Sequence, residues 1–402
     1  MTSYGPGMTT DLSALQDDLV RLRRELHQMP EIGLDVPRTQ ERVLAALDGL
    51  PLEISTGTAT TSVTAVLRGQ AAQDGPVVLL RGDMDALPVV ERTGLDYAAT
   101  GGTMHACGHD LHTSMLVGAA HALSARRDSL AGDVVFMFQP GEEGFDGAGR
   151  MIDEGVLDAA GRRAEASYAL HVTSAFLPGG VFATRPGPLM AAAGILTVTV
   201  RGAGGHGATP HRAKDPIPAA CAMVSALQAF VTRRFDVFDP VVITVGTFHA
   251  GSAHNVIPDD AVFEATLRSF SPAAQARLLE ESVGVIRGVA AAHGVDVDVR
   301  ADELFPLTST DPARAAGVAD VVRERFGEER FLELPNPLTG SEDFSRVLDA
   351  VPGAMVFLGA TLPDRDPADA PFNHSPLAAF DDSVLSDGAA LYTELALQHL
   401  TA

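Results

Sequence analysis

The sequence has no tryptophan, and aromatic residues make up only 5% of its 402 residues. Proteins that bind single-stranded nucleic acids stack the bases on aromatic side chains, so this scarcity argues against such a surface. Positive charge is also scarce, because the formal net charge is -23. A surface of that charge repels phosphate backbones and anionic lipids. We therefore expect no nucleic-acid partner and no membrane partner.

Cysteine is limited to Cys107 and Cys221. Two cysteines do not make a disulfide framework, which is typical of proteins of the reducing cytoplasm. The first residues lack the basic and apolar regions of a signal peptide, and no apolar run is long enough to cross a bilayer. We expect a cytoplasmic protein whose first ten residues are disordered. Because Cys221 falls in an apolar helical segment, we expect its side chain in the core.

A chain of this length is long for one hydrophobic core and favours two domains. In its outer parts, apolar runs of strand length alternate with helical patterns, which indicates an α/β fold with a mostly parallel sheet. The expected strands there are 62–67, 76–83, 133–140, 167–172 and 354–360, and the expected helices are 12–29, 38–47, 109–126 and 382–399.

The middle of the sequence has a different pattern. Alternating strands are expected at 195–202, 240–248, 261–270 and 295–300, with helices at 216–234 and 272–293. This order describes a compact α+β module with a small antiparallel sheet. We therefore predict a discontinuous catalytic domain, residues 1–186 and 302–402, interrupted by a smaller inserted domain, residues 187–301.

Two polar motifs follow the strand expected at 76–83. In RGDMDALP, Asp83 and Asp85 alternate across the strand end, and in MHACGHDLH, Cys107 and His109 are separated by Gly108, which lets the backbone bend. A thiolate and an imidazole form a ligand pair suited to zinc and similar metals. The alternatives are a polar transition from strand to loop and a buried structural cysteine beside unrelated histidines.

Three further segments carry groups of the same chemistry. FQPGEEG places Glu142 and Glu143 at the end of a strand, where one glutamate can bind a metal while its neighbour acts as a general base. His171 lies near the end of the strand expected at 167–172, and His374 lies in the loop FNHSP. Each segment also has a simpler explanation. The two glutamates could form a solvated acidic turn, His171 could be a hydrogen-bonded core histidine, and His374 could be an ordinary turn residue. Together with Cys107 and His109 they form a coherent ligand set for two metal ions.

The motifs RGDMDALP, MHACGHDLH, QPGEEG, LHV, GGHGATPH, HNVIP, GSEDF and NHSP occur in this order. Their combination resembles the dimetal aminoacylase and carboxypeptidase family, and more closely its branch of auxin-conjugate hydrolases, hippurate hydrolases and bacterial N-acyl-amino-acid amidohydrolases. The resemblance extends from about Glu25 to Pro376. It implies that Glu142 is the general base, that Asp83 is structural and that Asp85 orients a ligand imidazole. The implied metal ligands are Cys107, His109, Glu143, His171 and His374.

The resemblance also assigns roles within the inserted domain. In GGHGATPH, His206 matches a histidine that reaches the active site of a partner subunit, where it would stabilise the oxyanion. Asn255 in HNVIP and Arg268 in TLRSF match positions that bind the carboxylate of the substrate. A lid and dimerisation domain, and with it a homodimer or higher oligomer, is therefore expected. From its residues alone, His206 fits a turn in a glycine-rich loop.

The implied activity is hydrolysis of the amide bond of an N-acyl amino acid, with an acetyl, benzoyl, aryl-acetyl or longer acyl group. It requires two divalent metal ions, for which zinc is the first choice and manganese, cobalt or nickel are alternatives. A dipeptidase or carboxypeptidase of the same family is the alternative activity. Two other classes are a thiol enzyme with Cys107 as nucleophile, which would tolerate chelators, and a non-catalytic metal-binding module.

Overall fold

The computed structural model describes residues 12–72 and 74–400, which divide into two compact units. The first unit comprises Met1–Leu189, Ser309–Asn336 and Arg346–Ala402, and the second comprises Met190–Thr308 and Pro337–Ser345. The first ten residues, which we expect to be disordered, lie outside the described residues. Two short strands, β7 (Gly187–Met190) and β14 (Thr308–Thr310), lie where the chain passes between the units.

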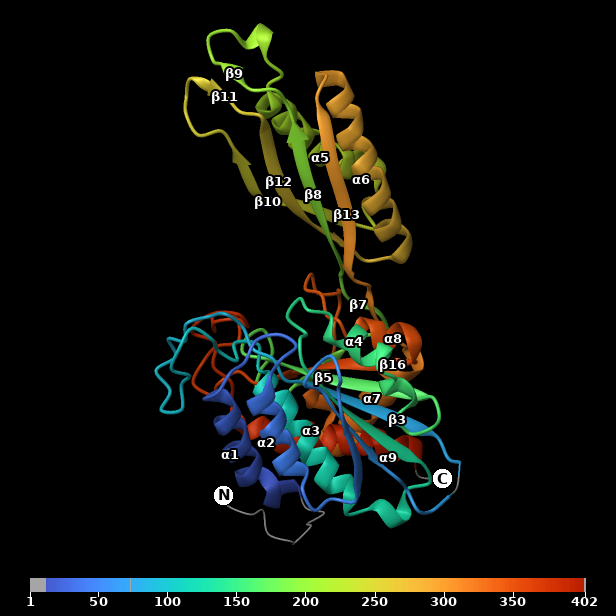
Figure 1. Ribbon diagram of the computed structural model, residues 1–402. Helices are drawn as coiled ribbons and strands as arrows, with labels where there is room; N and C mark the ends of the chain where they lie inside the picture. Colours follow the sequence, from blue (N-terminus) through green and yellow to red (C-terminus); the bar gives the residue numbers. More distant parts are fainter. Residues whose placement is uncertain (1–11, 73, 401–402) are drawn as a thin grey trace. The chain divides into compact units, whose positions relative to one another are not determined.

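The first unit is built on an eight-stranded sheet of order β1-β2-β4-β3-β5-β16-β6-β15. Figure 1 labels its strands β3, β5 and β16. Its central strands β4, β3, β5 and β16 run parallel to one another, whereas β1 and β2 are antiparallel at one edge. Central strands such as VVLLRGD are buried along their whole length, as expected for a sheet covered on both faces. The strands are β1 (Leu52–Thr56), β2 (Val63–Leu67), β3 (Val77–Asp83), β4 (Asp133–Gln139), β5 (Ala166–Thr173), β6 (Phe182–Thr184), β15 (Phe331–Glu333) and β16 (Gly353–Gly359).

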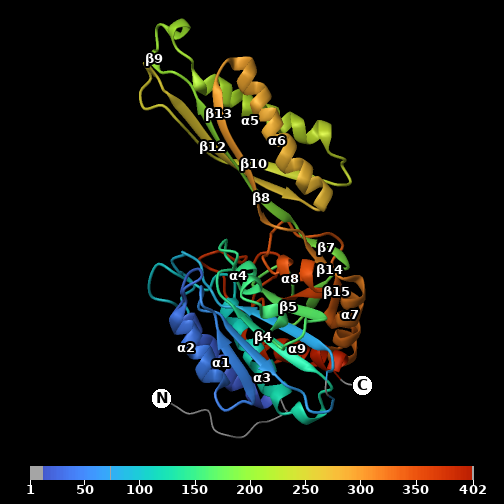
Figure 2. The same ribbon diagram turned by 45° about the vertical axis from the view of Figure 1, so that its right-hand side comes forward.

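Helix α3 is the central helix of this unit. It lies on strand β3 and packs against α1, α2 and α9, and both views show α1, α2 and α3 side by side (Figure 2). Because α3 is buried on nearly every side, its first turn is held rigidly against the sheet. The helices are α1 (Gln16–His27), α2 (Pro37–Leu47), α3 (His109–Ser124), α4 (Gly147–Asp153), α7 (Pro312–Phe326), α8 (Ser345–Ala350) and α9 (Leu385–Leu400).

The second unit is a four-stranded antiparallel sheet with two helices on one face (Figure 1). The sheet has the order β10-β12-β8-β13, and a separate two-stranded ribbon joins β9 to β11. Helix α5 begins at the N-cap Asp215, and α6 begins at the N-cap Ser271 and ends at a left-handed Gly294. Its elements are β8 (Ala192–Arg201), β9 (Gly205–His206), α5 (Pro216–Arg234), β10 (Val241–Ala250), β11 (Val256–Ile257), β12 (Asp260–Ser269), α6 (Pro272–His293) and β13 (Asp296–Phe305).

The mostly parallel α/β sheet predicted from the sequence is confirmed. The prediction that Cys221 lies in the core is wrong, because its side chain is exposed on α5. Helix α5 buries Ala219, Ala220, Met223 and Leu227, and Cys221 falls on the opposite side of this stripe. Within residues 12–72 and 74–400, no helix has the length and apolarity needed to span a bilayer.

Candidate metal centre

The five candidate ligands lie in, or in the segments that follow, four neighbouring strands of the first unit. Cys107 and His109 stand at the start of α3, Glu143 follows β4, His171 is in β5, and His374 is in the loop after β16. Strands β4, β3, β5 and β16 are adjacent and parallel, so their carboxyl ends meet at one edge of the sheet. Segments far apart in the sequence are thereby brought together at the usual place for a site in an α/β sheet.

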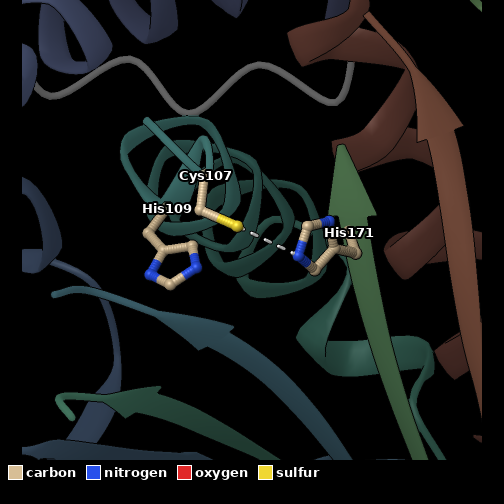
Figure 3. Close-up of side chains that lie close together, drawn as sticks. All are labelled: Cys107, His109 and His171. Carbon is tan, nitrogen blue, oxygen red and sulfur yellow. Dashed lines mark hydrogen bonds between the residues drawn. The ribbon is translucent and has the colours of Figure 1, made fainter. Parts of the chain in front are cut away.

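Cys107, His109 and His171 form the first group of donor atoms. Their nearest donor atoms lie within 4.8 Å of one another, and Cys107 lies between the two imidazoles (Figure 3). The Sγ atom of Cys107 is 3.5 Å from Nε2 of His171. The Nδ1–H of His171 donates to the carbonyl oxygen of Val172 at 2.9 Å, which leaves Nε2 as the nitrogen that can bind a metal.

Cys107, Glu143 and His374 form the second group, again with donor atoms within 4.8 Å. Nε2 of His374 is 3.3 Å from Sγ of Cys107 and 3.2 Å from Oε1 of Glu143. Cys107 belongs to both groups, so the two groups adjoin one another. This geometry matches a pair of adjacent metal sites.

The electrostatics of these residues fit a cation. Cys107, followed by Glu143, raises the pKa of His374 to about 10, a sign of excess negative charge. Burial holds the pKa of His171 well below its usual value and keeps this imidazole neutral, the form that binds metals. The ring nitrogens of the buried His109 face carboxylates, with Nε2 at 3.4 Å from Oδ2 of Asp83 and Nδ1 at 3.5 Å from Oδ1 of Asp85. Thiolate, carboxylate and imidazole are ligands that zinc accepts.

The backbone at the start of α3 has the conformation that the motif predicts. Gly108 has φ of +88° and separates the two candidate ligands Cys107 and His109. A Cβ atom added at this position would lie 2.3 Å from Cγ2 of Val172. Glycine is therefore required both by the left-handed conformation and by the close approach of β5.

The two glutamates are held in place by Asp85. Its Oδ1 accepts the backbone N–H of Glu142 at 2.9 Å, and its Oδ2 accepts that of Glu143 at 3.1 Å. The family resemblance implies that Asp85 orients a ligand imidazole, and Oδ1 of Asp85 lies 3.5 Å from Nδ1 of His109. The hydrogen bonds of Asp85 thus position the turn that carries both glutamates. Glu142 is buried in this turn.

Asn373 is a contributor that the sequence analysis does not identify. Its side-chain N–H groups donate to the carbonyl oxygens of Cys107 at 3.1 Å and Val172 at 3.0 Å, and its Oδ1 accepts the N–H of Ser174 at 2.9 Å. Asn373 therefore joins the ligand loop after β16 to α3 and β5. His374 has φ of +72°, a strained conformation for a non-glycine residue that this fixed neighbour supports.

The second unit holds three candidate residues at two separate positions: His206 and Asn255 at the ribbon of β9 and β11, and Arg268 in β12. His206 in β9 pairs with Val256 in β11, and Asn255 lies beside them, where its carbonyl accepts the N–H of Gly207 at 2.8 Å. The N–H of Ala208 donates to Nδ1 of His206 at 3.0 Å, so Nε2 carries the proton. Arg268 lies near the far end of β12, is half-buried and donates to Oγ of Ser341 at 3.1 Å.

The chain matches the model of the Peptidase family M20/M25/M40 over residues 79–398. It belongs to this family. Relatives include an IAA-amino acid hydrolase, ILR1-like 2, from Arabidopsis thaliana, 37% identical over 100% of this chain and 92% of the relative. Thermostable carboxypeptidase 1 from Saccharolobus solfataricus is 34% identical, over 97% of this chain and 98% of the relative.

A solved structure from Bacillus subtilis, described as a dinuclear metal binding peptidase of the M20 family, has a similar fold. It is 31% identical, covers 96% of this chain and 99% of its own, and superposes with a TM-score of 0.81. The predicted family and the prediction of a hydrolase of the amidohydrolase type are confirmed. The described residues also include groups able to hold metal ions.

Proposed function

We propose that this protein hydrolyses the amide bond of N-acyl amino acids and holds two divalent metal ions, with zinc as the native metal. The observation that carries this proposal is the pair of donor groups that share Cys107. The ligand set that we assign is Cys107, His109, Glu143, His171 and His374. When bound, the two ions acidify a water molecule and polarise the substrate carbonyl.

Glu142 is the proposed general base. Glu143 shares a donor group with Cys107 and His374, whereas both glutamates share one with His109. The resemblance to the family therefore supports the choice of Glu142 for proton transfer. Its carboxylate takes a proton from the attacking water as the new C–O bond forms. It then delivers that proton to the amine nitrogen as the C–N bond breaks, which yields a carboxylic acid and an amino acid.

The variant Glu142→Gln tests this division of roles, with Glu143→Gln as its matched neighbour. E142Q should keep both metals and lose about 10²–10⁴-fold in kcat, the usual value of a general base. E143Q should lose metal as well as activity. Metal content by mass spectrometry and turnover are measured on the same samples. Near-normal turnover by E142Q would refute the assignment.

The arrangement of the second unit supports a homodimer with shared active sites. Asp260 begins β12 beside the ribbon of His206 and Asn255, and Arg268 lies eight residues further, about 26 Å at the usual rise of a strand. A small substrate is too short to contact residues at both ends of β12 at the same time. If Arg268 and Asn255 bind one carboxylate, as the sequence predicts, they come from different subunits. Nε2–H of His206 would then donate to the oxyanion in the partner's site.

Mixing two inactive variants tests this shared site. E142Q and H206A should each be inactive, but subunit exchange should restore roughly a quarter of the wild-type activity, because half of the dimers are mixed and each has one intact site. Sedimentation gives the oligomeric state in parallel. Full activity of a monomer would refute the role of His206 in a partner's site.

Exposed apolar side chains support an acyl group larger than acetyl. In the described part of the first unit, the exposed phenylalanines are Phe145, Phe176 and Phe372, and each lies within five residues of a proposed ligand. Such apolar side chains around a few polar groups are typical of sites for small organic ligands. A screen of N-acetyl, N-benzoyl, long-chain acyl and indole-acetyl amino acids should show the highest kcat/KM for the larger groups.

A carboxypeptidase activity is the second candidate, because a relative over the full length of the chain bears that name. Peptides with a free amino terminus distinguish the two. Rapid cleavage of such peptides, with slow turnover of every N-acyl amino acid, would favour the carboxypeptidase.

A further inference from the structure

His112 is a buried imidazole that the proposed mechanism does not use. It lies on α3, one turn after His109, and its ring is fully buried. Its ring centroid is 5.4 Å from that of His109 and 4.9 Å from that of His171. His112 therefore packs against two of the proposed ligands, whose own ring centroids are 6.3 Å apart and which Figure 3 shows on either side of Cys107.

Both nitrogens of His112 are occupied by hydrogen bonds. The backbone N–H of Val172 donates to Nε2 at 2.7 Å, so Nδ1 carries the proton and donates to Oδ1 of Asp83 at 2.6 Å. A nitrogen that accepts an N–H cannot also bind a metal, so His112 is not a ligand. The two bonds fix the plane and position of its ring.

Asp83 is itself held from several sides. Nη1 of Arg81 donates to Oδ2 of Asp83 at 2.8 Å, and Nε of Arg81 donates to Oε1 of Gln139 at 2.8 Å. Arg81, Asp83 and Gln139 are fully buried. A Cβ atom at Gly82 would lie 2.9 Å from the carbonyl oxygen of His112, so this glycine lets β3 approach α3 closely enough for the contact.

We propose that His112, anchored by Asp83, is a positioning residue of the metal site. Through its ring it sets the place of the His109 and His171 imidazoles, and through the N–H of Val172 it fixes the end of β5 beside His171. Fixed outer groups of this kind reduce the freedom of ligands before a metal binds. The inference rests on the proposed ligand set.

Two variants separate the two hydrogen bonds of His112. In H112N the amide nitrogen occupies the place of Nδ1, which keeps the bond to Asp83 but removes the acceptor for Val172. In H112Q the amide oxygen reaches the place of Nε2, which keeps that acceptor but removes the donor to Asp83. Both variants remove the ring that packs against His109 and His171. H121N is the matched control, because it removes only the bond from Nε2 of His121 on the same helix to the carbonyl oxygen of Ala46.

Zinc affinity is measured by competition with a chromophoric chelator, independently of activity. Both His112 variants should bind zinc about 10–100-fold more weakly than the wild type, the usual effect of losing such an outer group. H121N should match the wild type. With saturating cobalt, the thiolate charge-transfer and d–d bands should shift in the His112 variants, and kcat should fall while KM stays near its wild-type value.

Every result decides the question. Wild-type zinc affinity and an unchanged cobalt spectrum in a folded His112 variant would show that the ring only fills the core. Failure of both His112 variants to fold with zinc, while H121N folds, would show that His112 supports the whole fold and would also overturn the inference. A wild-type protein that binds no metal would instead refute the proposed ligand set.

Discussion

Asp85 offers a sharp test of how the site is built, because each of its two carboxylate oxygens accepts a hydrogen bond from a different backbone N–H group. Oδ1 accepts the N–H of Glu142 and Oδ2 accepts the N–H of Glu143. Asparagine has nearly the same shape but only one accepting oxygen. In D85N one of the two backbone N–H groups must therefore face an amide NH₂, and the turn that carries both glutamates must move.

The size of the effect follows from these two contacts. A hydrogen bond to a charged acceptor contributes about 1.5–3 kcal/mol, and a buried N–H left without a partner costs about 1–3 kcal/mol. Because the two terms overlap, we expect D85N to lower the free energy of unfolding by about 2–4 kcal/mol. Displacement of Glu142 and Glu143 should also lower kcat by about 10-fold or more.

D311N is the matched control. Asp311 also accepts two backbone N–H groups, those of Ala313 and Arg314, but both bonds go to Oδ1, which asparagine retains. Its unfolding free energy should change by less than about 0.5 kcal/mol, because asparagine and aspartate are similar N-caps.

Urea unfolding of the metal-free protein measures both variants by tyrosine emission. The described tyrosines, Tyr97, Tyr168 and Tyr392, all belong to the first unit, and the chain has no tryptophan. Equal losses of stability in D85N and D311N, or an unchanged kcat in D85N, would refute the reasoning.

Three further predictions follow from the same structure. Dialysis against a chelator should abolish turnover, and added zinc should restore it, whereas a thiol enzyme would keep its activity. Gly108→Ala should cost at least about 1–2 kcal/mol from its left-handed conformation alone and reduce metal content in the purified protein. Burial, followed by Arg314, lowers the pKa of His399 to about 4. As the pH falls from about 6.5 to 4, the unfolded chain takes up a proton that the folded state does not, so stability should fall, and H399Q should weaken this dependence in urea titrations.

The sequence predicts the elements whose pattern is strong. Strands β3, β4 and β5 are continuous apolar runs, and helices α5 and α6 have clear caps, so each is placed correctly. Strand β1 was not predicted, because it is an exposed edge strand whose residues LEIST lack a buried face. The two-residue strands β9 and β11 carry no period that a sequence pattern could show.

The residues of the candidate site also divide into those that the sequence reveals and those that only the structure reveals. Cys107, Glu143 and His171 are recognisable because each stands at a strand end or a helix start, where chemistry is expected. Asn373 was not predicted although it adjoins His374, since its contacts to Cys107 and Val172 link segments that are 266 and 201 residues apart. The motif MHACGHDLH contains His112 but does not reveal its role, because its two hydrogen bonds depend on how β3 and β5 meet α3.

The charges at the site explain why the unfolding of D85N and D311N is measured on the metal-free protein. The site gathers the side chains of Asp83, Asp85, Cys107 and Glu143, and Arg81 is the buried arginine that pairs directly with Asp83. Bound cations would relieve the repulsion among these groups and so stabilise the folded state, by about 2.7 kcal/mol for one site at a free metal concentration 100 times the Kd. An effect of that size is comparable to the loss expected for D85N. If the metals bind where we propose, adding zinc should raise the urea midpoint of the wild type more than that of either His112 variant. A chelator that removes the metal should reverse this rise in each protein.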